Sequence, residues 1–424
     1  MLDINLIRKD SDKVKQALLK RMDMISFDEL LSWDTEYRSV LTETESLKAQ
    51  RNTVSSLIPK LKKQGVDVTE KLVEMKVIAD RIKDMEDKSD ELNKKIKVFM
   101  ENLPNIPADD VVAGDKENNV VVRSWGEKPV FDFQPKDHVE LVESLNLVDY
   151  QRGVKIGGSG FWVYKGKGAI LEWALLNFFI TEHINDGYEF ILPPHILNWE
   201  CGYTAGQFPK FKDDVFALEG ERDERMQFIL PTAETALASL HRNEVLKEEE
   251  LPKKYFAYTP CYRKEAGSYR TDERGMIRGH QFNKVEMFQY TLPENSEAAL
   301  EELIQKAERL VQKLGLHYRV SKLAAKDCSA SMGKTYDIEI WIPSMNQYKE
   351  ISSASNGYDY QARRGNIRFK RNATKKNEPV HTLNASGLAT SRLLPAIVEQ
   401  YQQKDGSVIV PEVLRNIVGT DVLK

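Results

Sequence analysis

The chain has 424 residues, a length that favours two or more domains over one. Apolar residues make up 41 % of it, enough for a sizeable core, and a formal net charge of −4 argues against indiscriminate DNA binding while allowing a local basic strip. The cysteines Cys201, Cys261 and Cys328 have no zinc-ligand or CxxC spacing and are interpreted as reduced thiols. The charged N-terminus and the lack of a stretch of ~20 apolar residues predict a soluble, cytoplasmic protein without a membrane partner, and no DNA partner is expected at this net charge.

The N-terminal quarter has helical periodicity. Apolar residues at helical spacing predict a short capping helix within residues 1–25. Residues 27–103 then carry two apolar series separated by a break at Gln64 and Gly65. The first series is Val40, Leu47, Val54 and Leu61, and the second is Met75, Ile78, Ile82, Met85, Ser89, Leu92, Ile96, Phe99 and Leu103. Such spacing is typical of a coiled-coil seam and predicts an antiparallel helical hairpin, the arm.

Two further expectations concern this arm. Pro59 lies within the first helical series and should kink that helix or end it early. Periodicity by itself favours a dimerisation coil or a passive spacer over an arm that binds a ligand.

Residues 104–130 have the composition of a linker, and the pattern becomes mixed after residue 130. Predicted helices at 138–147 and 169–185 alternate with β-rich runs at 190–192, 226–230, 284–290, 336–341 and 348–353. Several strands follow one another without an intervening helix, so we predict an α+β fold whose mainly antiparallel sheet is flanked by helices. The predicted domains are residues 1–108 and 109–424.

The sequence has no phosphate-binding loop of the G-x-x-x-x-G-K-[ST] type. The glycines at 157–160 and 166–168 do not fit that motif or a dinucleotide fingerprint, and we interpret them as a hairpin turn. A nucleotide site must therefore use arginines and carboxylates. Residues 262–278 are predicted to form strand, loop and strand, with arginines on both sides of the loop. One arginine alone is more often a surface ion-pair member, but a cluster on paired strands suits phosphates.

Three later stretches add candidates. Phe282 is placed to stack on a purine, with Glu286 four residues beyond it. Glu350 and Ser353 offer the oxygen ligands that Mg²⁺ prefers, although a Glu and a Ser that cap a loop would look the same. Arg392 is predicted in the first turn of a helix, where a cation opposes the helix dipole, which suggests that it faces an anion.

These stretches resemble the signature motifs of class II aminoacyl-tRNA synthetases, in the variant used by the seryl-tRNA synthetase family. The resemblance covers essentially the whole chain and implies the catalytic fold of that class. It rests on MLDINLIRKD, the arm, LPTAE, YRKEAGSYR, RGMIRGHQFNKVE, KTYDIEIWIPS, EISSASN, QARRGNIRF, HTLNASGLATSR and DGSVIVPEVL. The stretch GYEFILPP (187–194) resembles the first class II motif, whose prolines lie at the dimer interface, and so implies a homodimer. The loop 269–274 differs in sequence from the loop that is usual in this family.

The resemblance implies a role for each matching residue. The serine-binding set is Thr232, Ala233, Glu234, Arg263, Glu286, Asn384 and Ser386. The ATP-binding set is Arg263, Lys264, Glu265, Arg278, Phe282, Glu350, Ile351, Ser352, Ser353 and Arg392, with Glu350 and Ser353 as Mg²⁺ ligands. Arg263, Glu286 and Arg392 are the implied catalytic group. The arm, about residues 27–103, is implied to grip the long variable arm of serine tRNA.

The implied activity is that of a serine–tRNA ligase, which forms seryl adenylate from L-serine and ATP and transfers the seryl group to the 3′ end of tRNA. Such chemistry needs orientation and charge neutralisation and no side-chain nucleophile. Two alternatives are a paralogue that delivers activated serine to another acceptor and a non-catalytic RNA-binding paralogue. The retained arm argues against the first, and the retained charged residues argue against the second.

Overall fold

The computed structural model describes residues 1–219, 226–265 and 275–424. The chain divides into two compact units. The arm unit comprises residues 3–16 and 23–103, and the sheet unit comprises residues 1–2, 17–22 and 104–424. The functional boundary at residue 108 stays a prediction. Within the described residues, no helix is long and apolar enough to cross a membrane, and a cytoplasmic location likewise stays a prediction.

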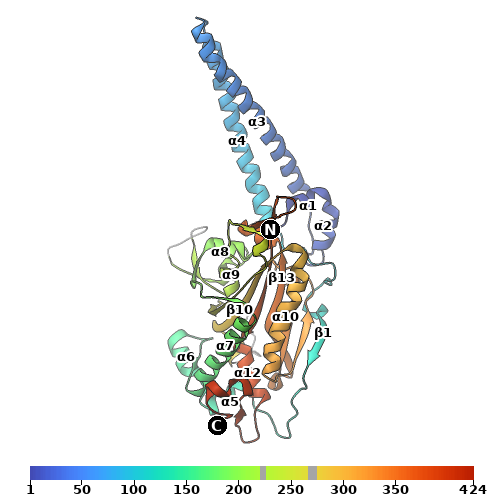
Figure 1. The fold of residues 1–424 in the computed structure, drawn as a ribbon, viewed down its shortest axis with the longest axis vertical. Coiled ribbons are helices and arrows are strands. Elements are labelled where there is room, and N and C mark those ends of the chain that lie inside the picture. Colours follow the sequence, from blue (N-terminus) through green and yellow to red (C-terminus); the bar gives the residue numbers. More distant parts are fainter. Residues whose placement is uncertain (220–225, 266–274) are drawn as a thin grey trace. The chain divides into compact units, whose positions relative to one another are not determined.

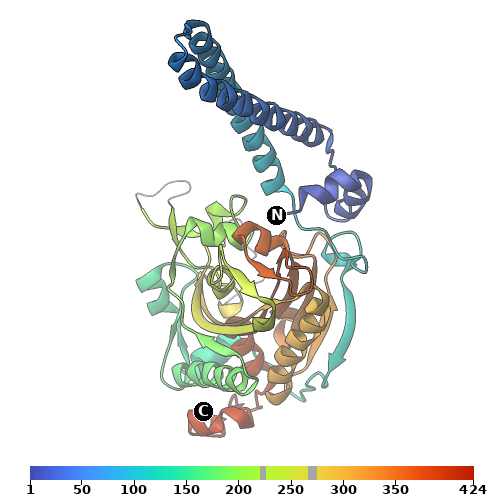
Figure 2. The same cartoon turned by 45° about the horizontal axis from the view of Figure 1, so that its top comes forward.

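The arm unit is a helical hairpin. Two short helices, α1 (Ile4–Lys9) and α2 (Ser11–Leu18), take the place of the one predicted helix. The long helices α3 (Asp28–Lys63) and α4 (Thr69–Asn102) then lie side by side (Figures 1 and 2), which confirms the predicted hairpin. Gly65 forms the turn between them with a φ of 74°.

The predicted seam is where the two long helices meet. Val40, Leu47 and Val54 of α3 are buried, as are Ile78 and Ile82 of α4. Ion pairs across the hairpin join Lys48 to Glu86 and Lys88 to Glu36, each at 2.6 Å, and also Arg81 to Glu43. Such exposed pairs stabilise little, but they report the antiparallel register.

Pro59 does not end α3 early, so that part of the prediction is wrong. The helix continues to Lys63. Proline removes the hydrogen bond to the carbonyl four residues earlier, a loss that one remaining turn tolerates because packing along the seam holds the helix.

The sheet unit is built on an eight-stranded sheet in the order β1-β11-β12-β13-β16-β10-β9-β4. All neighbours are antiparallel except β4 and β9, which confirms the predicted mainly antiparallel sheet. The strands are β1 (Val120–Trp125), β4 (Glu189–Ile191), β9 (Lys253–Tyr262), β10 (Gln281–Thr291), β11 (Tyr318–Lys322), β12 (Lys334–Ile342), β13 (Gln347–Tyr358) and β16 (His381–Ala389).

Helices cover one face of this sheet. The helices α5 (His138–Ser144), α7 (Lys167–Asn185), α10 (Ser296–Lys313) and α12 (Thr390–Gln400) share one apolar core with it (Figures 1 and 2). Strand β10 shows how the two faces differ. Val285 and Met287 are in that core, and because side chains alternate, Phe282, Lys284 and Glu286 point to the opposite face. That opposite face carries most of the candidate site residues.

The glycine cluster between β2 (Val148–Asp149) and α7 is not a hairpin turn. Gly157 ends the helix α6 (Tyr150–Gly157), and Gly158 follows it with a φ of 91°. After β3 (Val163–Tyr164), which pairs with β2, Gly166 precedes the first turn of α7 with a φ of 50°. The glycines therefore terminate and start helices, where left-handed backbone is needed.

Smaller elements complete the sheet unit. One three-stranded sheet contains β5 (Ile196–Asn198), β7 (Gln227–Ile229) and β6 (Phe216–Ala217), and another contains β15 (Asn377–Pro379), β14 (Arg368–Lys370) and β8 (Val245–Lys247). The short helices α8 (Trp199–Thr204), α9 (Ala233–Leu237) and α11 (Tyr360–Gly365) contact one another or the main sheet. The C-terminal part holds β17 (Val408–Ile409), α13 (Arg415–Val418) and β18 (Val422–Leu423).

Candidate active site

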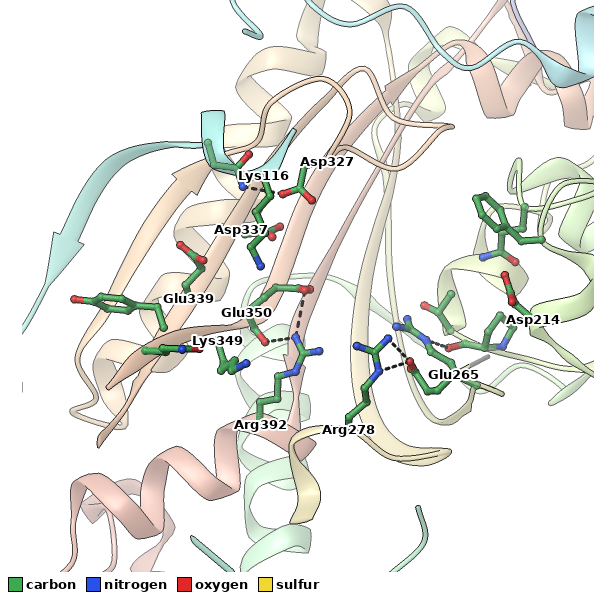
Figure 3. Close-up of a pocket in the computed structure, with 18 of the residues that line it drawn as sticks. Lys116, Asp214, Glu265, Arg278, Asp327, Asp337, Glu339, Lys349, Glu350 and Arg392 are labelled. Carbon is green, nitrogen blue, oxygen red and sulfur yellow. Dashed lines mark hydrogen bonds and ion pairs between the residues drawn. The ribbon is translucent and has the colours of Figure 1, made fainter. Parts of the chain in front are cut away.

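A cavity of about 1000 Å³, the main cavity, opens in the sheet unit. Arginines and carboxylates dominate its wall. In the view of Figure 3, Asp327, Asp337, Glu339 and Glu350 lie on one side and Asp214 and Glu265 on the other. Its lining includes Thr232, Arg263, Glu265, Arg278, Asp337, Glu350 and Arg392. The geometry thus combines groups that hold anions with groups that hold cations.

Arg263 follows directly after β9 and lines the main cavity. Its Nε donates to the carbonyl oxygen of Pro231 at 3.3 Å, and its guanidinium carbon lies 5.3 Å from the centre of the Phe282 ring. That ring, from β10, lines a smaller adjoining cavity together with Arg263. The predicted phosphate ligand and the predicted purine platform are therefore neighbours.

Glu265 and Arg278 face each other across the same region. The Nε of Arg278 donates to Glu265 Oε2 at 2.6 Å, and the Nη2 of Arg278 lies 2.6 Å from the same oxygen. These two residues lie on either side, in sequence, of the segment 266–274, which is outside the described residues. The loop 269–274, whose sequence differs from the one usual in the family it resembles, falls in that segment.

Arg392 lies in the first turn of α12, as predicted. Its Nη1 donates to the carbonyl oxygen of Glu350 at 2.8 Å and lies 3.3 Å from Glu350 Oε2, and its Nε donates to the carbonyl oxygen of Ile277. The guanidinium is thus held at the cavity wall beside Glu350 of β13 (Figure 3).

A β-bulge brings the two predicted Mg²⁺ ligands to one face. Glu350 and Ser353 are three residues apart, so a regular strand would place them on opposite faces. The pairing of β12 with β13 shifts: Asp337 lies opposite Ser353, but Glu339 lies opposite Glu350. Because Asp337 and Glu339 share a face, Ser353 and Glu350 do so too, and Ile351 is in the core.

Asp337 is a site residue that the sequence did not reveal. Its Oδ1 has no hydrogen-bond partner among the described residues, although it is shielded from solvent. Burial raises the pKa of Asp337 well above its usual value, and the nearby carboxylate of Glu350 raises it further. The bulge that brings Glu350 to the face of Asp337 and Ser353 has no signal in the sequence pattern.

A set of six residues, the inner polar cluster, adjoins the two cavities, because Thr232 lines the main cavity and Lys284 and Ser386 line the smaller one. The set is Thr232, Glu234, Lys284, Glu286, Asn384 and Ser386. Glu286 is 1 % exposed and accepts from Asn384 Nδ2 at 3.1 Å and from Ser386 Oγ at 3.4 Å. The Nζ of Lys284 lies 2.5 Å from Glu286 Oε2. Asn384 Oδ1 is buried and has no hydrogen-bond partner among the described residues.

Thr232 and Glu234 enter the cluster from the start of α9. Thr232 caps this helix, because its Oγ1 accepts from the backbone N–H of Glu234. Glu234 Oε1 accepts from Gln361 Nε2 at 2.9 Å. Burial raises the pKa of Glu234 to about 7, and the charge of Glu286 contributes to this shift. Gln361, the first residue of QARRGNIRF (361–369), is a second site residue that was not predicted from the sequence.

Four predicted site residues have other local roles. Lys264 Nζ donates to the carbonyl oxygen of Asp213 at 3.3 Å. Ala233, the first residue of α9, is fully buried in the core. Ile351 packs in the main core, and Ser352 Oγ donates to the carbonyl oxygen of Ser386 at 2.6 Å. Their contacts with substrates stay predictions.

Helix α7 contacts the two elements that carry site residues, β10 and α12, through Glu172. The buried Glu172 accepts at Oε1 from Asn283 Nδ2 (2.8 Å) and from Thr390 Oγ1 (2.6 Å). Asn283 lies between Phe282 and Lys284 on β10, and Thr390 is two residues before Arg392. One carboxylate thus links the strand and the helix that carry the site.

Comparison with known proteins decides the family. Residues 1–107 match the model of the seryl-tRNA synthetase N-terminal domain, and residues 216–401 match that of the tRNA synthetase class II core domain (G, H, P, S and T). A protein of Clostridium acetobutylicum named serine–tRNA ligase 2 is 66 % identical over the full length of both chains. The chain belongs to the seryl-tRNA synthetase family.

Other members of the family agree with this assignment. The serine–tRNA ligase of Thermodesulfovibrio yellowstonii is 47 % identical over both full lengths. The crystal structure of seryl-tRNA synthetase from Pyrococcus horikoshii complexed with ATP is 37 % identical, with a TM-score of 0.92 over 100 % of this chain and 99 % of that one. The cytoplasmic serine–tRNA ligase from Naegleria fowleri in complex with AMP has a TM-score of 0.88 at 28 % identity over 100 % and 99 %. The predicted family and its catalytic fold are therefore confirmed.

Proposed function

We infer that this protein is a serine–tRNA ligase, which activates L-serine with ATP and transfers it to tRNA. The observation that carries the inference is that the inner polar cluster adjoins cavities lined by arginines, in a chain whose relatives are named serine–tRNA ligases. From the geometry of the cavities and the inner polar cluster we also propose a role for each site residue.

The inner polar cluster suits the donors of serine. Glu234, Glu286 and the unpartnered Asn384 Oδ1 supply acceptors, while Lys284 supplies a single cation. A ligand that brings an ammonium and a hydroxyl would satisfy these acceptors. Thr232 and Ser386 add hydroxyls to the same site. A site built in this way disfavours alanine, which would leave the acceptors unpaired.

We propose that ATP binds in the main cavity and the smaller cavity that adjoins it. Phe282 and Glu265 would contact adenine, and Arg278 and Arg392 would bind the polyphosphate, since Glu265, Arg278 and Arg392 line both cavities and Phe282 lines the smaller one. Arg263 lies between this region and the inner polar cluster, since it contacts Phe282 on one side and the carbonyl before Thr232 on the other. It can therefore bridge the carboxylate of serine and the α-phosphate of ATP.

The oxygen set around Glu350 fits Mg²⁺. Glu350, Ser353 and the unpartnered Asp337 Oδ1 share one face at the bulge. No group of three or more His, Cys, Asp or Glu side chains is arranged to hold a metal in the described ranges, and Mg²⁺ is usually held by one or two carboxylates together with substrate phosphates. Glu350 and Ser353 would hold the ion, whose positive charge would help to neutralise the phosphates.

The residues orient the reactants in two steps. A carboxylate oxygen of serine attacks the α-phosphorus of ATP, the bond to the bridging oxygen breaks, and pyrophosphate leaves. Arg263 and Arg392 hold the anionic groups in line and stabilise the charge that develops. The 3′-terminal ribose hydroxyl of tRNA then attacks the carbonyl carbon of the seryl adenylate, and AMP leaves.

The arm unit is proposed to bind the tRNA. Its sequence matches the N-terminal domain of seryl-tRNA synthetases, and the long hairpin of α3 and α4 offers exposed lysines near its turn, including Lys60, Lys62 and Lys63. Such cations would bind phosphates of the long variable arm of serine tRNA.

A homodimer is proposed through α7 and β4. Trp173 of α7 is 54 % exposed and Leu192, directly after β4, is 72 % exposed, while Ile170 and Phe190 of the same elements are also exposed. Exposed apolar residues gathered in this way are typical of an interface. Sedimentation of the protein should give a dimer, and Trp173→Glu should give a monomer; a parent that sediments as a monomer would contradict the proposal.

The activation step can be tested by exchange of labelled pyrophosphate into ATP. We expect exchange with serine and Mg²⁺, and at least about 10³-fold less with alanine, since a site that hydrogen-bonds a hydroxyl rejects the analogue that lacks it. Exchange that depends on another amino acid would contradict the inference. A protein that forms seryl adenylate but charges no tRNA would instead support the alternative of another acceptor.

A further inference from the structure

Lys284 is a buried cation at the centre of the inner polar cluster. It lies on β10 between Phe282 and Glu286, and its side chain is only 8 % exposed. Its Nζ lies 2.5 Å from Glu286 Oε2 and donates to Thr232 Oγ1 at 2.7 Å. Lys284 thus joins β10 to the first turn of α9, and it contacts two residues that are proposed to bind serine.

The surrounding charges explain why a lysine is needed there. Glu286 is 1 % exposed, and a buried carboxylate is costly unless a cation and hydrogen-bond donors compensate it. Asn384 and Ser386 supply the donors, and Lys284 supplies the charge. Glu234, the other carboxylate of the cluster, is hydrogen-bonded to the neutral amide of Gln361.

This arrangement gives the two carboxylates different tasks. Glu286 already has an ammonium partner, so it suits a neutral hydroxyl donor from the substrate. Glu234 has a neutral partner, so it suits the ammonium of the substrate. The orientation of Glu286 depends on Lys284, because the other two contacts of its carboxylate are longer, at 3.1 and 3.4 Å.

We propose that Lys284 is a positioning residue that determines specificity: it fixes the Glu286 carboxylate and the Thr232 hydroxyl so that the site accepts serine and rejects alanine. The proposal rests on the proposed function. Lys284 acts through its partners and takes no part in the bond changes.

The first test is Lys284→Met, which keeps the length of the side chain and removes its charge. In pyrophosphate exchange we expect kcat/KM for serine to fall about 100-fold and the preference for serine over alanine to fall at least about 10-fold, in line with the loss of a buried hydrogen-bonded contact. The KM for ATP should stay within about threefold, because ATP binds to other residues.

Lys334→Met is the matched control. Lys334 is also a largely buried lysine, with ion pairs to Asp110 at 2.8 Å and to Glu297 at 3.0 Å, but it lies outside the cavities described above. Its replacement should lower the melting temperature and leave the serine preference unchanged. A purely structural role for Lys284 would make the two variants behave alike, and that result would overturn the proposal.

A second variant keeps the proposal testable if Lys284→Met does not fold. Lys284→Met combined with Glu286→Gln removes both members of the buried pair, which is far less costly than removing one. Because Lys284 is proposed to act through both Glu286 and Thr232, adding Lys284→Met to a protein that already carries Glu286→Gln and Thr232→Ala should leave its serine preference unchanged. A further loss of more than about threefold would contradict the proposal.

Failure of this role and failure of the proposed function give different results. A parent protein with serine-dependent exchange, together with a Lys284→Met variant of unchanged serine preference, would refute only the role of Lys284. A folded parent protein that exchanges pyrophosphate with no amino acid would refute the proposed function, and with it the role of Lys284.

Discussion

Arg392 and Glu350 form a hydrogen bond and an ion pair at the wall of the main cavity. Arg392 Nη1 lies 2.8 Å from the Glu350 carbonyl oxygen and 3.3 Å from Glu350 Oε2. Both residues are proposed to bind ATP or the accompanying cation. In the described structure their charges neutralise each other, so the guanidinium is already held at the position where phosphates would replace the carboxylate as its partner. Nucleotide binding should therefore exchange one ion pair for another without a large movement of α12.

Arg392→Ala should raise the KM for ATP roughly 10- to 100-fold, since a hydrogen bond to a charged group contributes about 1.5–3 kcal/mol. Serine binding should change little. The measurement is pyrophosphate exchange with varied ATP, and Arg371→Ala is the control because Arg371 pairs with Glu294 and Glu378, residues that do not line the cavities. An unchanged KM for ATP in Arg392→Ala would place the polyphosphate elsewhere.

Serine binding should depend on pH through Glu234. Burial and Glu286 raise the pKa of this carboxyl to about 7, against the opposing effects of Lys284, Gln361 and Arg263. The ammonium of serine favours the ionised form, so a proton must leave on binding below pH 7. The KM for serine should then rise as the pH falls below 7, approaching about tenfold per pH unit, and should level off above 7.

The check is the KM for serine between pH 5.5 and 8.5 at saturating ATP and Mg²⁺. Glu234→Gln should bind serine more weakly and lose this pH dependence. A KM for the parent that is flat between pH 6 and 8 would show that Glu234 does not receive the ammonium.

Glu172 should lower the stability of the protein at alkaline pH. Burial raises its pKa to about 7, so between pH 4.5 and 7 the folded state keeps a proton that the unfolded state has lost. The free energy of unfolding therefore falls as the pH rises through this range, by about 3 kcal/mol in full. Glu172→Gln should remove this dependence. The stability of the variant relative to the parent should therefore be greater at pH 8 than at pH 5.

Thermal unfolding at both pH values checks this expectation. Glu182→Gln is the control on the same helix, since Glu182 is paired with Lys313 at the surface. An equal difference between parent and Glu172→Gln at the two pH values would contradict the account.

Shortening the arm should separate the two steps of the reaction. Ion pairs of Glu36 with Lys88 and of Glu43 with Arg81 report the register, in which residue 41 lies near residue 83. Replacing residues 41–83 by a short glycine-rich turn keeps the base of the hairpin, where Phe27 and Trp33 contact Phe99. Pyrophosphate exchange should persist, and tRNA charging should fall at least about 100-fold, because phosphate contacts dominate the binding of nucleic acids. Equal charging would refute the proposed role of the arm.

The sequence predicted those parts of the fold that a repeating pattern specifies. Val40, Leu47 and Val54 at intervals of seven predicted the arm, and runs of strands without helices predicted the antiparallel sheet. The pattern could not reveal the bulge at Ile351, because a shift of register between two strands depends on both of them. The face of the sheet on which Glu350 and Ser353 lie, and the presence of Asp337 there, follow only from the structure.

Local signals also failed where tertiary contacts outweigh them. Pro59 marks a helix end by its chemistry, yet the packing of α3 against α4 carries the helix on to Lys63. The position of Lys284 could have been predicted from the sequence, since its even spacing from Phe282 and Glu286 on one strand places all three on the same face. Its role could not, because that role depends on the contact with Thr232, which is more than fifty residues away in the chain.

Charging of total deacylated tRNA with labelled serine, in the presence of ATP and Mg²⁺, tests the proposed activity and its acceptor together. We expect that label enters serine tRNA alone, and that the protein with the shortened arm loses this charging while it keeps pyrophosphate exchange. Charging with another amino acid, or no charging by a folded protein that makes seryl adenylate, would contradict the proposed function.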